Sequence, residues 1–118
     1  LQSRSMQALE QLQTGVLVGY LMALNHYLPD GQDVLDPRIS PLFSDRLQGQ
    51  PPALVIAGGH DPLWDDGQSY AKVLQEAGVT VEQLNYPGQI HIFVSVTKVI
   101  EQGNDAIRKS AEWLKNLF

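Results

Sequence analysis

The sequence predicts an α/β fold in which two parallel β-strands are joined by a helix. Residues 53–57 (Ala-Leu-Val-Ile-Ala) are continuously apolar and are followed by Gly58-Gly59, a pattern typical of a strand buried on both faces of a parallel sheet. A helical segment and a second strand follow, and three such elements within about 35 residues indicate a right-handed βαβ crossover. The chain has 118 residues, which is enough for one small domain and too few for two.

The first 28 residues have a helical pattern, because apolar side chains recur every three or four positions. Thr14-Gly15 is predicted to divide this segment into two helices, with Thr14 as the N-cap of the second, and Pro29-Asp30-Gly31 is predicted to end it. We expect the apolar stripe of the second helix to pack against the sheet, with the lining of an apolar ligand pocket as the alternative. The stripe consists of Leu17, Tyr20, Leu21, Leu24, Tyr27 and Leu28.

Residues 29–52 are predicted to form an irregular connector, because five of the seven prolines lie in this stretch and prolines exclude a regular helix. A connector of this length is either a functional excursion or a strap that packs across the surface. Within it, Asp36 and Arg38 are spaced to form a local ion pair, which on a surface contributes less than about 1 kcal/mol.

A helix and a more polar strand are predicted after the apolar strand. Asp65 and Asp66 begin the helix and Gly78 ends it, because acidic side chains favour the first turn and glycine favours the position after the last. Residues 79–86 are predicted to form the second strand, in which Glu82, Gln83 and Asn85 suit the edge of a sheet.

The rest of the chain is predicted to contain a turn and a final helix. Residues 86–89 (Tyr-Pro-Gly-Gln) predict the turn, since proline presets its first central residue and Gly88 permits positive φ at the second. Residues 104–118 predict an amphipathic helix with Asn104 as its N-cap. The predicted buried stripe of this helix consists of Ile107, Ala111, Leu114 and Leu117.

The composition excludes several classes of protein. Eight Lys and Arg against thirteen Asp and Glu give a net charge of −5, so nonspecific nucleic-acid binding is not expected. No apolar run approaches the roughly 18 to 20 residues that span a bilayer, and no signal segment opens the chain, so a cytoplasmic location is expected although the sequence does not fix the compartment. With no cysteine, the chain has no disulfides, no Cys-zinc site and no thiol chemistry.

Two residues with complementary chemistry follow the two predicted strands. Asp61 lies just beyond the first strand and His91 just beyond the second, thirty positions later. Because the carboxyl ends of neighbouring parallel strands meet at one sheet edge, about 4.8 Å apart, the two side chains are placed to meet. An aspartate that orients a histidine is half of a nucleophilic triad. The alternatives are a loop carboxylate that binds backbone amides ahead of Pro62, and a solvated turn histidine.

Other histidines and aspartates near this edge have simpler explanations. His60 abuts Asp61, but adjacent side chains in an extended segment point apart, so we expect His60 to face away. A metal site that combines His60 with the nearby aspartates is less favoured, because Asp65 and Asp66 already suit a helix N-terminus. We therefore expect no metal and no cofactor. His26 is interpreted as an ordinary residue of an amphipathic helix.

Several segments, taken together and in this order, carry a family resemblance. They are residues 36–42 (DPRISPL), 51–63 (PPALVIAGGHDPL), 65–67 (DDG) with 70–71 (YA), and 86–91 (YPGQIH). They resemble the connector, the penultimate strand with its catalytic acid, the following helix and the catalytic-histidine loop of the hormone-sensitive-lipase-like esterases, a branch of the α/β-hydrolase fold. The match covers roughly residues 20–118, and linked motifs at consistent spacing are more specific than any one of them.

The resemblance implies a partial α/β-hydrolase fold, made of the last two parallel strands, their flanking helices and part of the helical cap. The implied segments are a cap at residues 1–28, the Pro-rich connector at 29–52 and the C-terminal βαβα part at 53–118. The resemblance also implies Asp61 as the triad acid and His91 as the triad base. The family usually has glycine after the histidine, whereas this chain has Ile92, a change expected to narrow the site or reorient the loop.

Two parts of that family's catalytic machinery are absent from the chain. It contains neither the Gly-x-Ser-x-Gly elbow of the nucleophile nor an HGGG-type oxyanion segment. In this fold the nucleophile precedes the acid and the histidine, so we expect it, and most of the sheet, upstream of Leu1. The expected function is that of a C-terminal fragment of a serine carboxylesterase or lipase, inactive alone because it lacks the nucleophile and the oxyanion donors.

The expected partners follow from this interpretation. They are the missing N-terminal portion, an ester substrate in the intact enzyme, and a second copy that pairs through the exposed sheet edge. One alternative is a non-catalytic α/β interaction or assembly domain, which the missing serine favours. Another is a divergent hydrolase with a different nucleophile, such as Asp65, although nothing in the sequence places Asp65 in that role.

Overall fold

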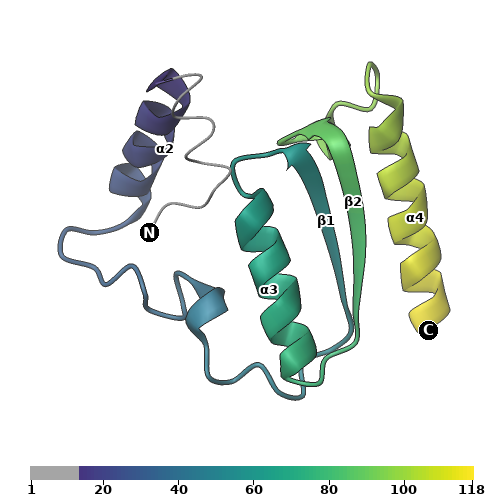
Figure 1. Ribbon diagram of the computed structural model, residues 1–118, viewed down its shortest axis with the longest axis horizontal. Helices are drawn as coiled ribbons and strands as arrows, with labels where there is room; N and C mark the ends of the chain where they lie inside the picture. The colour runs from purple at the N-terminus through teal and green to yellow at the C-terminus, as the bar shows by residue number, and fades with distance from the viewer. Residues whose placement is uncertain (1–13) are drawn as a thin grey trace.

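The computed structural model of the chain describes residues 14–118, with side chains from Leu21 onward. Its elements, in chain order, are α2 (Thr14–Tyr27), the 3-10 turn η1 (Pro41–Phe43), β1 (Ala53–His60), α3 (Trp64–Glu76), β2 (Val81–Ile90), the 3-10 turn η2 (Phe93–Ser95) and α4 (Glu101–Leu117). The two strands form one sheet that lies between α3 and α4 (Figure 1). None of the helices within residues 14–118 is both long enough and apolar enough to cross a membrane.

The predicted βαβ unit is confirmed. β1 and β2 pair in parallel, in a register that runs from Ala53 opposite Val81 to Gly58 opposite Tyr86. Asp65 and Asp66 lie in the first turn of α3, and Gly78 follows the helix with φ of 83°, the left-handed conformation that glycine adopts without steric cost. Because the strands are parallel, the loops after β1 and β2 leave the same edge of the sheet.

The predicted turn at residues 86–89 is wrong, because β2 continues through these residues to Ile90. His60 pairs with Ile90, so Gly59 alone lies opposite Pro87, Gly88 and Gln89, and β2 bulges here. A bulge accommodates the proline, which has no N–H to donate to a regular ladder. Pairing with the extended β1 therefore overrides the local turn preference of the Pro-Gly pair.

Gly58 and Gly59 are required by this bulge. A Cβ atom at Gly58 would lie 2.7 Å from the carbonyl oxygen of Gln89, and one at Gly59 would overlap the backbone of Pro87. Real Cβ atoms do not approach backbone atoms so closely, so any side chain at either position forces the strands apart. The glycine pair thus lets the bulge lie directly against β1.

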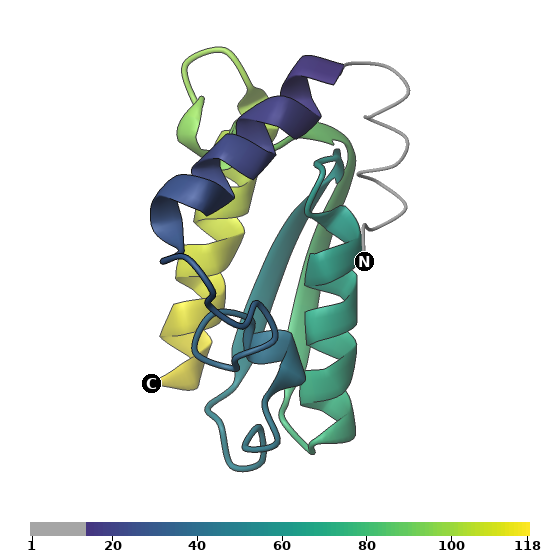
Figure 2. The same cartoon turned by 90° about the vertical axis from the view of Figure 1, so that its left-hand side faces the viewer.

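Each face of the sheet has its own hydrophobic cluster. The α3-side cluster is built on Leu47, Leu74 and Val79, and the α4-side cluster on Tyr86, Phe93 and Ala106. Figure 2, which shows the molecule from the side, has α3 and α4 on opposite sides of the strands. Residues of β1 outside Ala57 and Gly58 are only half-buried or exposed, so the expectation of a strand buried on both faces is met only in part.

Helix α4 differs from its prediction in two ways. It begins at Glu101, and Asn104 lies inside it, where its Nδ2 donates a hydrogen bond to the carbonyl oxygen of Thr97 (3.0 Å) rather than capping the helix. The helix buries Gly103 and Ala106, whereas the predicted buried stripe is exposed. Gly103 decides the orientation, because a Cβ at this position would lie 2.6 Å from the carbonyl oxygen of Phe93. The exposed stripe is Ile107, Ala111, Leu114 and Leu117.

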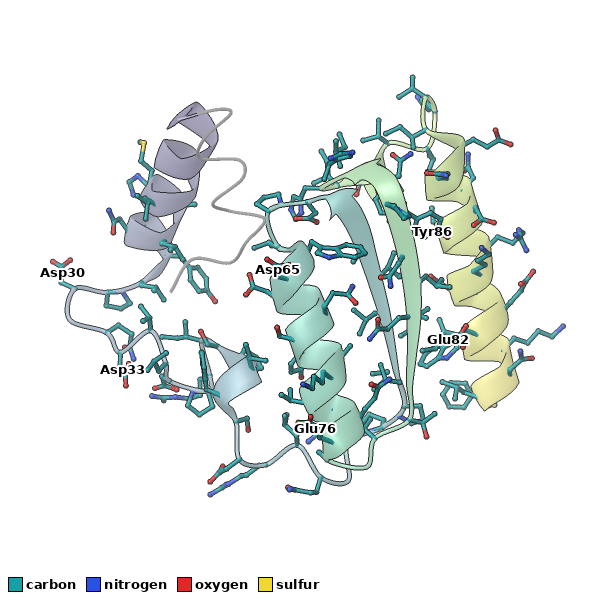
Figure 3. The ribbon with its side chains drawn as sticks, viewed as in Figure 1. Asp30, Asp33, Asp65, Glu76, Glu82 and Tyr86 are labelled. Carbon is teal, nitrogen blue, oxygen red and sulfur yellow. The ribbon has the colours of Figure 1, made fainter. Side chains whose placement is uncertain are left out.

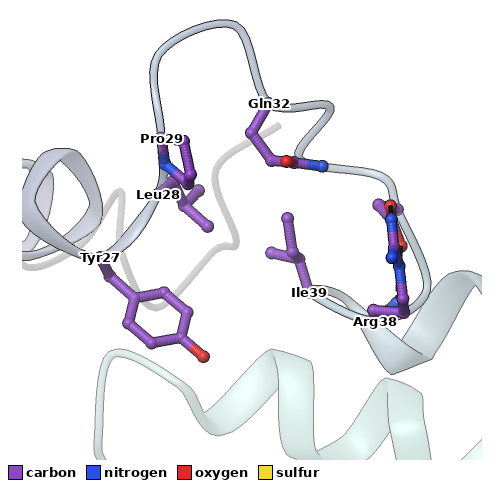
Figure 4. Close-up of a pocket in the computed structure, with 7 residues that line it drawn as sticks. Tyr27, Leu28, Pro29, Gln32, Arg38 and Ile39 are labelled. Carbon is purple, nitrogen blue, oxygen red and sulfur yellow. Dashed lines mark hydrogen bonds and ion pairs between the residues drawn. The ribbon is translucent and has the colours of Figure 1, made fainter.

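Helix α2 spans Thr14–Tyr27, and the helix expected before it lies outside the described residues. Thr14 is itself helical and is the first described residue, so its predicted role as N-cap stays a prediction. The expectation that the stripe of α2 packs against the sheet is met for neither Leu21 nor Tyr27, which are exposed, whereas Leu24 and Leu28 are half-buried. Figure 1 shows the connector carrying α2 away from the strands. Tyr27 and Leu28 instead border a shallow depression of about 280 Å³ at the start of the connector (Figure 4).

The connector is held by the predicted ion pair between Asp36 and Arg38. Nη2 of Arg38 lies 2.7 Å from Oδ2 of Asp36, whose Oδ1 also accepts the backbone N–H of Arg38 (2.9 Å). These bonds lower the pKa of Asp36 to about 2. Ser40 adds a hydrogen bond from its hydroxyl to the carbonyl oxygen of Val34 (2.7 Å), so this part of the connector is a structured strap.

A polar cluster around Asp105 fastens α4 to β2. The Tyr86 hydroxyl donates to Oδ2 of Asp105 (2.8 Å), and Nζ of Lys109 lies 2.8 Å from the same oxygen. Arg108 donates to the other carboxylate oxygen (2.6 Å). Figure 3 shows Tyr86 reaching from β2 toward α4. The bond from Lys109 is the main cause that lowers the pKa of Asp105 to about 2, and the bond from Tyr86 is the next.

This cluster predicts an acid-sensitive contribution to stability. Because the pKa of Asp105 falls from 3.8 to about 2 on folding, its contribution is complete above the unfolded value and is lost as pH falls toward 2. Asp105→Asn should therefore lower the free energy of unfolding at pH 7 but not below pH 2, as measured by urea denaturation across this range. Asp45→Asn, at a side chain 94% exposed, should change little at either pH. A deficit of Asp105→Asn that persists unchanged below pH 2 would contradict this account.

Candidate active site

Asp61 is fixed in the loop between β1 and α3 by both of its carboxylate oxygens. Oδ1 accepts the backbone N–H of Leu63 (2.8 Å), and Oδ2 lies 2.8 Å from Nδ1 of His91. The side chain is 14% exposed, so it is largely withdrawn from water. The predicted approach of Asp61 to His91 and the backbone-binding alternative considered for Asp61 therefore coexist, because the amide holds one oxygen while the other faces the imidazole.

His91 follows β2 directly, and its imidazole is 54% exposed. With Nδ1 turned to the Asp61 carboxylate, the favoured neutral tautomer carries its proton on Nδ1 and leaves Nε2 with a lone pair. The imidazole is thus oriented with its basic nitrogen pointing away from Asp61 and accessible to a reacting group. The two loops, thirty positions apart in the sequence, are side by side in the structure.

The chain reverses immediately after His91. Ile92 has φ of 61° and ψ of 3°, and it is the one non-glycine residue between 14 and 118 with positive φ. For a residue with a side chain, this left-handed conformation costs roughly 1–2 kcal/mol. Its carbonyl oxygen accepts the N–H of Ser95 (2.8 Å), and Phe93, only 3% exposed, enters the α4-side cluster against the ring of Tyr86. The reversal thus anchors the histidine loop in the core.

Asp66, in the first turn of α3, belongs to the same acidic neighbourhood. Burial is the main cause that raises its pKa, followed by repulsion from Asp65 and then from Asp61. The arrangement concentrates negative charge at the loop end of α3. Such a field favours positive charge in front of Asp61, as an imidazolium carries during proton transfer.

The other two histidines, His60 and His26, are not part of the Asp61–His91 pair. His60 ends β1 and is exposed, and His26 is exposed on α2. Within the part of the chain that the structure describes, no group of three or more His, Asp or Glu side chains is arranged to hold a metal ion. The cluster considered around His60 therefore has no metal-binding geometry.

One contact near the site was not predicted from the sequence. Nε2 of Gln68 donates to Oδ1 of Asn85 (3.0 Å), which ties the start of α3 to β2, whereas Asn85 was interpreted only as an edge residue. The left-handed conformation of Ile92 could have been predicted, because the family that the chain resembles usually has glycine at this position and glycine adopts positive φ without steric cost.

Comparisons with known proteins agree with this geometry. A family described as alpha/beta hydrolase fold matches residues 3–95, which is more than half of the chain. The chain belongs to the alpha/beta hydrolase fold family. Within the family it resembles the hormone-sensitive-lipase-like esterases, and a solved hormone-sensitive lipase from a metagenome library superposes on 75% of this hydrolase chain with a TM-score of 0.72 and 29% identity, over 30% of its own length.

Two further relatives of this chain are ester hydrolases by name. The carboxylic ester hydrolase LipN of Mycobacterium tuberculosis is 47% identical over 72 residues, which are 59% of this chain and 19% of LipN. The structure of ester hydrolase EH1AB1 from the metagenome of Lake Arreo has a TM-score of 0.82 and 37% identity, and the match covers 95% of this chain and 36% of that protein. The chain spans between 19% and 33% of the length of the curated relatives that it matches.

Proposed function

We propose that this chain is the C-terminal portion of a serine carboxylesterase and supplies two of its three triad residues, Asp61 as the acid and His91 as the base. The observation that carries the proposal is the 2.8 Å contact between Oδ2 of Asp61 and Nδ1 of His91. This contact leaves Nε2 of the accessible imidazole free to take a proton from a reacting hydroxyl group. Several relatives are named as ester hydrolases or esterases, which supports esters as the substrate class.

The chemistry assigns one proton path to the pair. Nε2 of His91 takes the proton of a serine hydroxyl, supplied by the upstream portion, as the serine oxygen attacks the ester carbonyl. The same nitrogen then gives that proton to the departing alkoxide, which leaves as the alcohol. Water, deprotonated by Nε2 in its turn, attacks the acyl-enzyme, and Nε2 then returns that proton to the departing serine oxygen, which releases the carboxylic acid and restores the serine hydroxyl. Asp61 holds the tautomer and stabilises the imidazolium in both halves of the reaction.

Two observations support the assignment to a portion of a larger enzyme. The chain contains no Gly-x-Ser-x-Gly elbow, and it spans at most 33% of the curated relatives named above. Without a nucleophile and oxyanion donors, an Asp–His pair has neither an acyl group to transfer nor a developing charge to stabilise. We assign residues 1–28 to the cap, 29–52 to the connector and 53–118 to the hydrolase domain.

Uncovered apolar surface supports the same assignment. The outer face of α4 exposes Ile107, Leu114 and Leu117, side chains whose spacing is typical of a buried helix face. The described sheet has two strands, so β1 presents one edge on which a further strand fits. Alone in solution, the chain is expected to hide these surfaces by pairing with copies of itself.

The proposal is tested by joining the chain to the part that it lacks. The segment of EH1AB1 that superposes on this chain is replaced by it, and hydrolysis of ethyl acetate is measured beside the two separate parts. We expect the joined hydrolase to be active, and the 118-residue chain alone to be inert and to elute as oligomers in size-exclusion chromatography with light scattering. A joined protein that folds by circular dichroism but hydrolyses no ester contradicts the proposal. A compact, cooperatively unfolding monomer of the chain alone favours the interaction-domain alternative.

A further inference from the structure

The strained residue beside the catalytic base is the feature that the proposed function leaves unexplained. Ile92 holds a left-handed conformation although its side chain is β-branched, the type least suited to positive φ. The side chain is 60% exposed, so burial of its own apolar surface compensates little of the strain. A glycine at this position would make the same reversal without steric cost.

The conformation persists because both neighbours of Ile92 are fixed. His91 is bonded to Asp61 at 2.8 Å, and Phe93 is buried in the α4-side cluster. The backbone must therefore turn from the sheet edge into the core within one residue. Strain that the surrounding structure imposes in this way concentrates at functional sites, so the outlier points to a role for the side chain itself.

The position of Ile92 indicates which part of an ester it meets. Nε2 of His91 gives its proton to the leaving alcohol, so the alcohol must depart close to the imidazole face opposite Asp61. Ile92 follows His91 directly in the chain, carries a branched side chain and is 60% exposed. An apolar wall there limits the size of the alcohol and leaves the acyl side of the ester open.

Resting on the proposed esterase function, we infer that Ile92 is a specificity-determining residue that selects esters of small, unbranched alcohols. Ile92 follows His91 directly in the chain and is exposed, and its strain is retained because the side chain restricts the alcohol site. The residue takes no part in proton transfer. Its effect is therefore expected in the ratio of kcat/KM between alcohols, with the pH profile of the reaction unchanged.

Three variants of the joined hydrolase separate bulk from backbone strain. Ile92→Ala removes the branch but keeps a Cβ, whereas Ile92→Gly removes both. Ile90→Ala is the matched control, because Ile90 is also exposed and adjoins His91 but lies in β2 with ordinary φ. Each is assayed with ethyl and tert-butyl acetate, which differ in the alcohol, and with ethyl acetate and ethyl hexanoate, which differ in the acyl group.

We expect the tert-butyl to ethyl ratio of kcat/KM to rise about tenfold or more in both Ile92 variants, the range in which apolar contacts discriminate between substrates. The hexanoate to acetate ratio should change less than twofold, and Ile90→Ala should alter neither ratio. Ile92→Gly should raise the denaturation midpoint more than Ile92→Ala does, because alanine relieves only the strain of the β-branch whereas glycine relieves it fully. The role of Ile92 is overturned if the tert-butyl to ethyl ratio of kcat/KM stays unchanged in an active enzyme, or if Ile90→Ala changes it equally. Either result leaves the proposed esterase function standing. A wild-type joined protein that does not hydrolyse ethyl acetate overturns the proposed function as well.

Discussion

His91→Ala should reduce kcat/KM of the joined hydrolase for ethyl acetate by about 10⁴-fold or more, because it removes the group that moves the proton in both halves of the reaction. Asp61→Asn should cause a loss of similar order, roughly 10⁴-fold, since an amide no longer holds the imidazole in the tautomer with a free Nε2. Both variants should keep the circular dichroism spectrum of the parent, because His91 is half exposed and asparagine preserves the shape of Asp61. The measurement is steady-state ester hydrolysis across a series of pH values.

His60→Ala is the matched control for this experiment. His60 precedes Asp61 and is exposed at the end of β1, so a nearby histidine is removed without touching the Asp61–His91 pair. We expect its kcat/KM to stay within about twofold of the parent, as for most surface substitutions. If His91→Ala retained the parent rate, or if His60→Ala lost it, the assignment of His91 as the base would be wrong.

Gly59→Ala should have the largest effect on stability among single substitutions in the sheet. The new Cβ would overlap the backbone of Pro87, which has no flexible end that can move aside. Overpacking of this kind costs typically 1–3 kcal/mol and more where backbone must shift, so we expect a loss of about 3 kcal/mol or more. Because the strain acts on the bulge just before His91, activity should fall together with the midpoint of urea denaturation.

Gly88→Ala tests whether the stability loss of Gly59→Ala comes from the close approach of Gly59 to Pro87 or follows from replacing any glycine in the bulge. Gly88 lies opposite Gly59 and has ordinary φ, and a Cβ atom added to it would meet no other atom within 4 Å. Its replacement should change the free energy of unfolding by less than about 0.5 kcal/mol. A Gly59→Ala variant as stable as Gly88→Ala would show that the bulge does not press against β1.

Much of the fold was predictable because the strongest local patterns coincide with the tertiary structure. The apolar run of β1, the acidic start of α3 and the glycine after it all determine structure within a few residues. The turn expected at residues 86–89 and the cap expected at Asn104 were wrong because long-range pairing decides both. β1 holds the Pro-Gly segment extended, and the approach of Gly103 to Phe93 sets where α4 begins and which face it buries.

The candidate site was predictable to the extent that topology places it. Parallel neighbours bring the residues after two strands to one edge, which made a meeting of Asp61 and His91 one of the interpretations, and the family resemblance selected it. The amide of Leu63 and the left-handed backbone of Ile92 depend on the path of the loops, which no periodicity encodes. The stripe of α4 was expected to be buried but is exposed. The spacing of its apolar residues shows that the helix has an apolar face, but it does not show which part of the protein covers that face.

The separation of the two hydrophobic clusters has a consequence for how the joined hydrolase of the proposal would lose activity on heating. Asp61 is attached to β1 and the start of α3, whereas His91 is tethered through Phe93 to the cluster under α4. Proteins open in cooperative units below the temperature of global melting. Loosening of α4 would release the imidazole while β1 and α3 stay in place, so catalysis would fail at a lower temperature than the secondary structure.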